Sequence, residues 1–139
     1  MSSTVHSCGR LTVFEIAPLM NGCAAYALPS KPRPEFVETF GIALVEKMLA
    51  GGGPVITTTT GGIPESVGDT AIDVDAGDTK SLATAIDHAV LEMSADERAA
   101  LGLRARRHAV QFDRVAVFDR LFAGLTAETK LPVKATLTY

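Results

Sequence analysis

Short β-type segments that alternate with helical ones constrain the fold of this chain more than any other feature. Three of them stand out, at residues 23–28, 55–58 and 71–74. The first is continuously apolar, which is typical of strands buried on both faces of a parallel sheet. The second consists of β-branched residues, which favour strands. Strands alternating with helices predict an α/β fold with a Rossmann-like parallel sheet flanked by helices.

The segments between and after the strands carry helix signals. Residues 41–50 are apolar on nearly all sides, and the glycines and proline of residues 51–54 stop this helix. Ser94 and Glu97, three residues apart, form a capping box that opens another helix. We expect a helical turn at 64–67, helices at 41–50, 78–93 and 94–110, and a last helix starting near residue 112. The apolar stripes predicted for the 78–93 helix and for the last helix are Leu82, Ile86, Ala89 and Val90, and Val115, Phe118, Leu121 and Phe122.

The number of strands predicts an incomplete domain. Doubly wound domains have five or six strands, and this chain of 139 residues shows three secure ones. We therefore expect the second half of a Rossmann-like domain at residues 23–127, after a poorly defined segment at 1–22 and before a loosely docked tail at 128–139. A half domain leaves a sheet edge and an apolar face uncovered, which favours a homo-oligomer.

The composition argues against several classes of function. The net charge of −3 provides no basic field for nucleic acid, and Arg104, Arg106 and Arg107 are interpreted as a solvated helix face. No apolar run is long enough to span a membrane and no signal peptide is evident, so we expect a cytoplasmic protein without membrane insertion. Cys8 and Cys23 lack metal-ligand spacing, and we expect neither a metal nor a cofactor.

Two glutamates, Glu38 and Glu46, flank a Phe-Gly step at the start of the 41–50 helix. Helical side chains lean toward the N-terminus, so Glu46 can reach a ligand at the helix start and accept two hydroxyl hydrogen bonds. Glu38 precedes backbone amides that attract anions, and as an acid it suits sugar hydroxyls better than phosphate. Two alternatives stay open: Glu38 as an acid that complements the helix dipole, and Glu46 with Lys47 as a solvated edge.

Residues 61–65, Gly-Gly-Ile-Pro-Glu, follow the second predicted strand. Open α/β sheets bind ligands at the carboxyl ends of their strands, so this turn is a candidate part of the same site. The alternative is a tight connection from strand to helix without a ligand. The segment matches neither the Gly-x-Gly-x-x-Gly fingerprint nor a P-loop, so neither an NAD nor an ATP site is indicated.

Taken together, these residues resemble the C-terminal domain of nucleotide-sugar glycosyltransferases of the group 1 (family 4) type. The resemblance covers about residues 24–122 and rests on Pro29-Ser30, Glu38-x-Phe40-Gly41, Glu46 and Gly61-Gly62-Ile63-Pro64-Glu65. It implies the two-domain GT-B architecture. It also implies transfer of a hexose from a UDP-, GDP- or similar nucleotide sugar to an acceptor hydroxyl, with retention at the anomeric carbon.

The resemblance assigns roles to individual residues. The position of Glu38 contacts the donor sugar and stabilises charge at the anomeric centre, which makes Glu38 the candidate catalytic residue. The backbone of Phe40, Gly41 and Ile42 lies by the sugar and diphosphate, and Glu46 binds the ribose. Metal is usually not essential in this fold, because cationic side chains and helix ends stabilise the leaving diphosphate.

The chain also departs from the family pattern. It looks truncated, because the N-terminal acceptor-binding domain and the usual arginine and lysine for the diphosphate are missing. We therefore expect little or no transferase activity from this chain alone, with a missing domain or a partner chain completing the enzyme. Two alternatives stay open: a non-catalytic nucleotide-sugar-binding or degenerate module that packs with a partner, and a sugar-nucleotide epimerase with the same two-domain fold.

Overall fold

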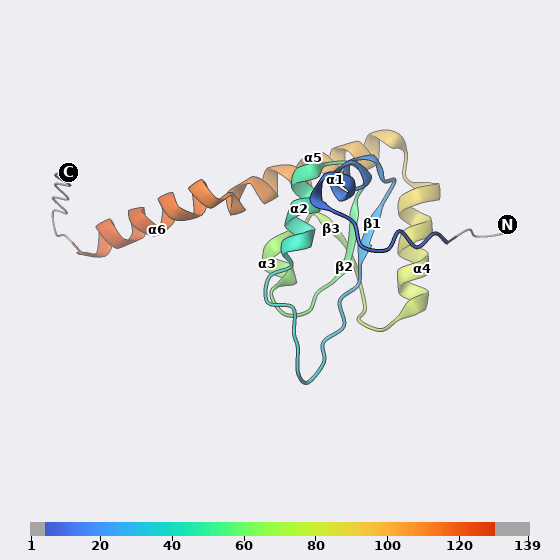
Figure 1. The fold of residues 1–139 in the computed structure, drawn as a ribbon, viewed down its shortest axis with the longest axis horizontal. Coiled ribbons are helices and arrows are strands. Elements are labelled where there is room, and N and C mark those ends of the chain that lie inside the picture. The colour runs from blue at the N-terminus through green and yellow to red at the C-terminus, as the bar shows by residue number, and fades with distance from the viewer. Residues whose placement is uncertain (1–4, 130–139) are drawn as a thin grey trace. The chain divides into compact units, whose positions relative to one another are not determined.

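The computed structural model describes residues 5–129 and contains a three-stranded parallel sheet (Figure 1). The strands are β1 (Tyr26–Leu28), β2 (Val55–Thr58) and β3 (Ala71–Val74), in the order β1-β2-β3. Val55 at the start of β2 lies level with Tyr26 on one side and with Ala71 on the other. The predicted α/β fold with a parallel sheet flanked by helices is confirmed.

Helices connect the strands and continue the chain after them. Helix α2 (Ile42–Ala50) joins β1 to β2, and the short α3 (Ile63–Val67) joins β2 to β3. The remaining elements are α1 (Val13–Gly22), α4 (Thr79–Asp87), a π-helical turn (His88–Glu92), α5 (Ala95–Ala109), a 3₁₀ turn (Val110–Phe112) and α6 (Arg114–Thr129). The chain forms two compact units, one up to Ala109 and one from Val110 onward. The domain limits expected from the sequence, 23–127, stay a prediction.

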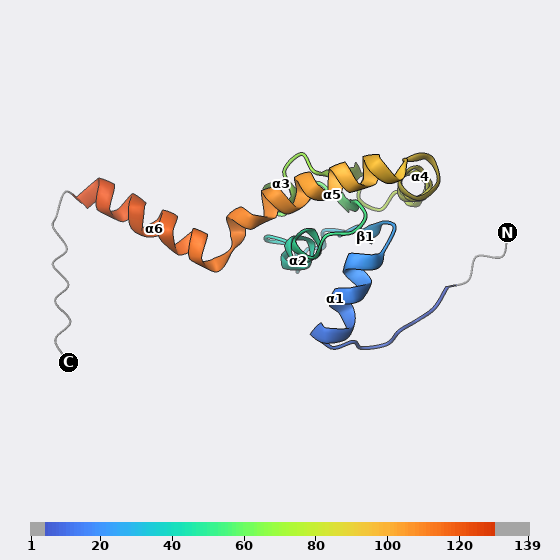
Figure 2. The same cartoon turned by 90° about the horizontal axis from the view of Figure 1, so that it is seen from above.

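Both faces of the sheet in the first unit are covered by helices (Figures 1 and 2). All four residues of β2 are buried. Because successive strand residues face opposite sides, Ile56 packs with Ala85 and Ala89 on the α4 side. Val55 faces the other layer, where α2 contacts α1, α3 and α5. The core therefore consists of two thin apolar layers with β2 between them.

The first strand is shorter and less buried than predicted. Ala27 is exposed, and Tyr26 and Leu28 are only half-buried. The physical reason is that β1 pairs with β2 alone, so it is an edge strand with neighbours on one side. The burial on both faces that continuous apolarity predicted is wrong for β1.

The helix predicted at 78–93 is α-helical only to Asp87 and continues as the π-helical turn. Ala85 and Ala89 are buried where this segment comes closest to the sheet. Ile86 and Val90 lie at the margin of that contact, and each keeps 38% of its surface exposed. The predicted apolar face is confirmed for Ala89 and for half-buried Leu82, and it is wrong for Ile86 and Val90. The small side chains of Ala85 and Ala89 allow the closest packing on the sheet.

Helix α1 was not predicted, because Pro18 interrupts an apolar stretch without a clear period. The structure shows a capping box at its start. The Glu15 carboxylate accepts hydrogen bonds from the Thr12 amide at 2.8 Å and the Thr12 hydroxyl at 2.7 Å. A threonine and a glutamate three residues apart are a start signal that the sequence already contained. Asn21 then ties the end of α1 to the carbonyl oxygen of Ala50 at 2.7 Å.

The second unit consists of the 3₁₀ turn and α6. The predicted last helix is confirmed, and the Asp113 carboxylate caps its start by accepting from the Val115 amide at 2.9 Å. Phe118 and Phe122 stack with ring centroids 6.4 Å apart. They nevertheless remain half or more exposed, as do the other members of the predicted stripe, Val115 and Leu121. Most of the predicted tail, from residue 130 onward, lies outside the described residues.

Lys47 is buried, with 1% of its surface exposed, so the interpretation of Lys47 as part of a solvated edge is wrong. Its ammonium group donates to the carbonyl oxygens of Gly51 at 2.5 Å and Gly53 at 2.9 Å. Burial lowers the pKa of Lys47 below its usual range. The lysine therefore holds the Gly-rich turn that follows α2 from inside the protein.

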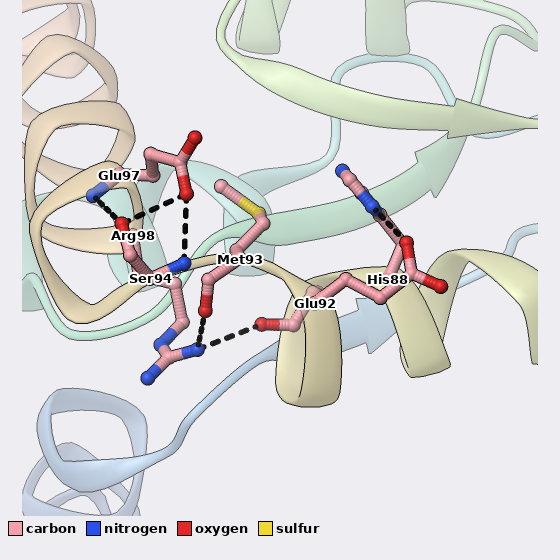
Figure 3. Close-up of polar contacts among 7 residues, drawn as sticks. His88, Glu92, Met93, Ser94, Glu97 and Arg98 are labelled. Carbon is pink, nitrogen blue, oxygen red and sulfur yellow. Dashed lines mark hydrogen bonds and ion pairs between the residues drawn. The ribbon is translucent and has the colours of Figure 1, made fainter.

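The capping box predicted at the start of α5 is confirmed (Figure 3). The Glu97 carboxylate accepts from the Ser94 amide at 2.7 Å and the Ser94 hydroxyl at 2.8 Å, and the Glu97 amide donates back to that hydroxyl at 3.2 Å. The hydrogen bonds from the Ser94 backbone and hydroxyl lower the pKa of Glu97 below its usual range. A carboxylate with a lowered folded-state pKa stabilises the fold above its unfolded-state pKa, and this stabilisation is lost as the pH falls through the folded-state pKa.

We expect the Glu97→Gln variant to lose less stability than the wild type when the pH falls from 6 to 3. The melting temperatures of the two proteins, measured across this range, test the prediction. Asp96→Asn is the matched control, because Asp96 lies in the same first turn and makes no side-chain hydrogen bond among residues 5–129. If the melting temperatures of Glu97→Gln and wild type fell by the same amount across this pH range, the stabilising role assigned to the Glu97 carboxylate would be contradicted.

Candidate functional site

The candidate site lies at the carboxyl edge of the sheet, where the loop of residues 29–41 meets the turn after β2. Two buried threonines of β2 donate hydrogen bonds to the last residue of β1 and to Ser30, which follows Pro29 in the loop. The Thr57 hydroxyl donates to the Leu28 carbonyl oxygen at 2.9 Å, and the Thr58 hydroxyl donates to that of Ser30 at 2.7 Å. These hydrogen bonds position the loop that carries Glu38 relative to the sheet.

Gly61 and Gly62 allow the Glu38 loop to lie directly against this turn. The Gly62 amide donates to the Glu38 carbonyl oxygen at 2.9 Å. A Cβ atom on Gly61 would lie 2.0 Å from that carbonyl oxygen, and one on Gly62 would lie 1.8 Å from the carbonyl oxygen of Thr39. Because both neighbours are backbone atoms, only glycine fits these positions without moving the loop. The Gly-Gly pair is therefore required for the close approach of two segments that flank the candidate site.

The Glu38 carboxylate lies just ahead of the start of α2. Its Oε1 atom accepts from the Gly41 amide at 3.0 Å and, in a longer contact, from the Phe40 amide at 3.4 Å. Gly41 has a φ of +80°, in the left-handed region that favours glycine, and it is the residue at which the loop enters α2. With the carboxylate just ahead of the helix, the structural alternative for Glu38 and its donor-binding role both stay open.

Two further amides at the same helix start are open to a ligand. Among the described residues, no acceptor lies within hydrogen-bond distance of the Ile42 and Ala43 amides, which belong to the first turn of α2. The side chain of Ile42 is 67% exposed. First-turn amides carry a partial positive charge and bind phosphate or carboxylate groups. The helix start therefore has two amides, those of Phe40 and Gly41, that donate to Glu38. The next two, those of Ile42 and Ala43, have no acceptor among the described residues.

Glu46 lies one helical turn after Ile42 on the same face of α2, because residues four apart are neighbours on a helix. It is exposed. Burial raises the pKa of Tyr26, the first residue of β1, and the negative charge of Glu46 raises it further. The predicted site residues Glu38, Phe40, Gly41 and Ile42 gather at the helix start, with Glu46 one turn further along α2.

A pocket of about 150 Å³ opens at the same edge of the sheet, on the α4 side. Its polar lining combines Lys31 with Asp75 and Asp78, and the Lys31 side chain lies over Gly77. Sequence reasoning assigned none of these three side chains to a site. The sequence could have indicated them, because Lys31 follows β1, and Asp75 and Asp78 follow β3. The carboxyl ends of parallel strands meet at one edge of the sheet, so side chains at these positions come together.

No cluster of three or more histidine, cysteine, aspartate or glutamate side chains within residues 5–129 could hold a metal ion. Likewise, no helix in that range is long and apolar enough to cross a membrane. The described site offers groups for hydrogen bonding. Carboxylates can accept from hydroxyl groups, and helix-start amides can donate to an anion.

Comparison with known proteins identifies the family. Residues 1–92 match the profile described as "Glycosyl transferases group 1". This chain belongs to the group 1 glycosyltransferases. The match includes Glu38, Glu46 and the Gly-Gly-Ile-Pro-Glu turn, and it extends to the first residue, whereas the sequence resemblance began near residue 24. No curated protein sequence matches this glycosyltransferase chain significantly.

Solved structures of glycosyltransferases contain the same fold. The Anabaena protein Alr3699/HepE, in complex with UDP-glucose, superposes with a TM-score of 0.64 at 28% identity and covers 78% of this chain. Sucrose-phosphate synthase from Thermosynechococcus elongatus gives 0.55 at 28% identity over 75% of this chain. Trehalose-6-phosphate synthase OtsA gives 0.68 over 86%, and at 14% identity it supports the fold alone.

This glycosyltransferase chain corresponds to a minor part of each of these proteins. It spans 29% of the Anabaena protein and 26% of each of the two synthases. The matched part contains a parallel sheet flanked by helices, as GT-B glycosyltransferases have. The predicted membership in this family and the predicted GT-B-type fold are confirmed.

Proposed function

We propose that this chain binds the nucleotide-sugar donor of a retaining hexosyltransferase at the carboxyl edge of its sheet. Glu46 accepts hydrogen bonds from the ribose hydroxyls, and the backbone of Phe40, Gly41 and Ile42 lies by the sugar and diphosphate. The observation that carries this proposal is the helix start of α2. Its Ile42 and Ala43 amides have no acceptor among the described residues, and exposed Glu46 follows on the same face.

The site geometry supports a donor that carries both hydroxyl groups and phosphates. Free first-turn amides favour an anion, and a carboxylate accepts two hydroxyl hydrogen bonds at once. The Anabaena relative is described in complex with UDP-glucose, and we extend a donor of this class, UDP- or GDP-linked, to the present chain. Since the chain spans only 29% of that relative, an additional domain or partner chain would supply the acceptor site.

A second function, donor binding without catalysis, is favoured by one observation. The Glu38 carboxylate, our candidate for stabilising charge at the anomeric centre, accepts the Gly41 and Phe40 amides. In this arrangement Glu38 shapes the helix start through Oε1, and Oε2 is the oxygen left to accept from a sugar hydroxyl. Measuring the release of glucose from UDP-glucose by the isolated chain separates the two functions. Turnover at the rates of full-length relatives would exclude a purely binding role.

We expect the isolated chain to bind UDP and the Glu46→Gln variant to bind it about tenfold more weakly. The amide keeps one oxygen but loses the charge, and a hydrogen bond to a charged group contributes about 1.5–3 kcal/mol. Isothermal titration calorimetry with UDP, GDP and uridine measures the effect and compares the bases. We expect uridine to show the same relative loss, because the ribose carries the contact.

The matched control is Glu92→Gln. Glu92 is an exposed glutamate with a surface contact to His88 at 2.9 Å, on the π-helical turn that covers the other face of the sheet. This variant should bind UDP as the wild type does. Failure of the wild-type chain to bind UDP or GDP at millimolar concentration would refute the proposed function. Equal affinity of wild type and Glu46→Gln would refute the role of Glu46.

A further inference from the structure

A recess beside the glycine-rich turn of residues 51–53 lies at the other end of the sheet from the donor site. Its volume is about 440 Å³, within the range of small-molecule pockets. Residues that precede β1 and β2, namely Cys23, Ala24 and the Gly51–Gly53 turn, form one wall, and residues of α5 between 95 and 106 form the other. We call this recess the amino-edge groove, because it lies where the strands begin.

The charge of the amino-edge groove is positive, although the whole chain carries −3. Arg98 and Arg106 line it, and none of its described lining residues is acidic. Most of the rest of the lining is alanine, glycine and Leu103. Apolar walls with a few convergent polar groups are the usual composition of a small-molecule site.

Arg98 is held in place by the protein before any ligand arrives. One nitrogen of its guanidinium group donates to the Met93 carbonyl oxygen and, at 3.4 Å, to that of Ala89 (Figure 3). The guanidinium carries five N–H donors, so three of them, on its other two nitrogens, remain for an anion. A side chain fixed in this way loses little conformational freedom on binding.

Arg106 provides a second cation on the same helix. It is exposed, and among residues 5–129 it has no hydrogen-bond or ion-pair partner. Its neighbour Arg104, in contrast, is paired with Asp69 at 3.0 Å. Arg106 is therefore available to a ligand in the same groove that Arg98 lines.

We propose that the amino-edge groove binds a small organic anion, with its acidic group on Arg98 and Arg106 and its apolar part against the alanines and Leu103. A phosphate ester and a carboxylate share this chemistry. The site is distinct from the proposed donor site, because its lining contains neither Glu38 nor Glu46 and it lies at the amino ends of the strands.

Cys23 makes the groove testable, since this free cysteine lies in its wall. In the full chain with Cys8→Ser, Cys23 is the only remaining thiol. We expect phenyl phosphate or benzoate to slow alkylation of Cys23 by N-ethylmaleimide at least fivefold, while benzyl alcohol has no such effect. The more protective of the two acids identifies the acidic group. Calorimetry with the same compounds gives the dissociation constants.

Arg106→Gln should weaken binding of the protective acid about tenfold, because it removes a charged hydrogen-bond donor. Arg107→Gln is the matched control: it makes the same change of charge one residue away, outside the groove lining, and should leave binding unchanged. Arg106 is exposed, so both variants should retain the wild-type melting temperature. Equal protection by benzyl alcohol, equal losses in the two variants, or no binding of either acid would overturn the proposal.

Discussion

Replacing Gly62 by alanine is expected to lower the free energy of unfolding by about 2 kcal/mol and to weaken UDP binding more than tenfold. The new methyl group would lie 1.8 Å from the Thr39 carbonyl oxygen and 2.5 Å from its carbon. Both are backbone atoms, so the clash is relieved only when the Glu38 loop moves away, and overpacking of this kind costs about 1–3 kcal/mol. That movement also breaks the hydrogen bond from the Gly62 amide to Glu38.

Thermal unfolding and UDP titration below the melting temperature measure the two effects separately. Gly22→Ala is the matched control, because no atom lies within 4 Å of a Cβ at that position and Gly22 is helical. It should change stability by no more than about 1 kcal/mol. A stable Gly62→Ala variant with wild-type affinity would show that the Gly-Gly contact does not position the donor site.

Replacing the buried Lys47 by methionine is expected to destabilise the fold by about 2 kcal/mol. The substitution leaves the Gly51 and Gly53 carbonyl oxygens without their donor, and an unsatisfied buried group costs about 1–3 kcal/mol. Part of this loss is offset, because methionine has a similar shape and no charge to desolvate. For a chain of this size the melting temperature should fall by about 6 °C.

Lys80→Met is the control for Lys47→Met, because Lys80 is exposed and its capping contact to Asp78 uses the backbone amide. It should stay within about 0.5 kcal/mol of the wild type. Calorimetric unfolding of the three proteins gives the comparison. If Lys47→Met is as stable as the wild type, the two carbonyl contacts only balance the cost of burying the charge.

Much of the fold was predictable from local patterns. β2 and β3 occupy the predicted residues, and α2 and α5 agree within one residue of the predicted limits. Glycine and proline punctuation, β-branched runs and the Ser94–Glu97 box act within a few residues, so they are visible in the sequence. Helix α1 could also have been found from Thr12 and Glu15, whose hydrogen bonds follow the same pattern.

Burial was less predictable, because it depends on neighbours that are distant in sequence. β1 is apolar, but it is half-buried because it pairs with one strand only. Lys47 is charged, but it is buried because the turn of residues 51–53 presents carbonyl oxygens to it. From hydrophobicity alone, β1 was expected to be buried and Lys47 to be exposed.

The order of elements, the group 1 glycosyltransferase motif and the position of its glutamates around one helix start can all be read from the residues alone, since each depends on short-range spacing. The folded backbone was needed to learn that Gly61 and Gly62 lie against the carbonyl groups of Glu38 and Thr39, and that two arginines line one groove at the far edge of the sheet. The glycine contacts and the groove depend on ångström-scale distances between segments that are far apart in the sequence. Such distances are set by packing, and no local pattern encodes them.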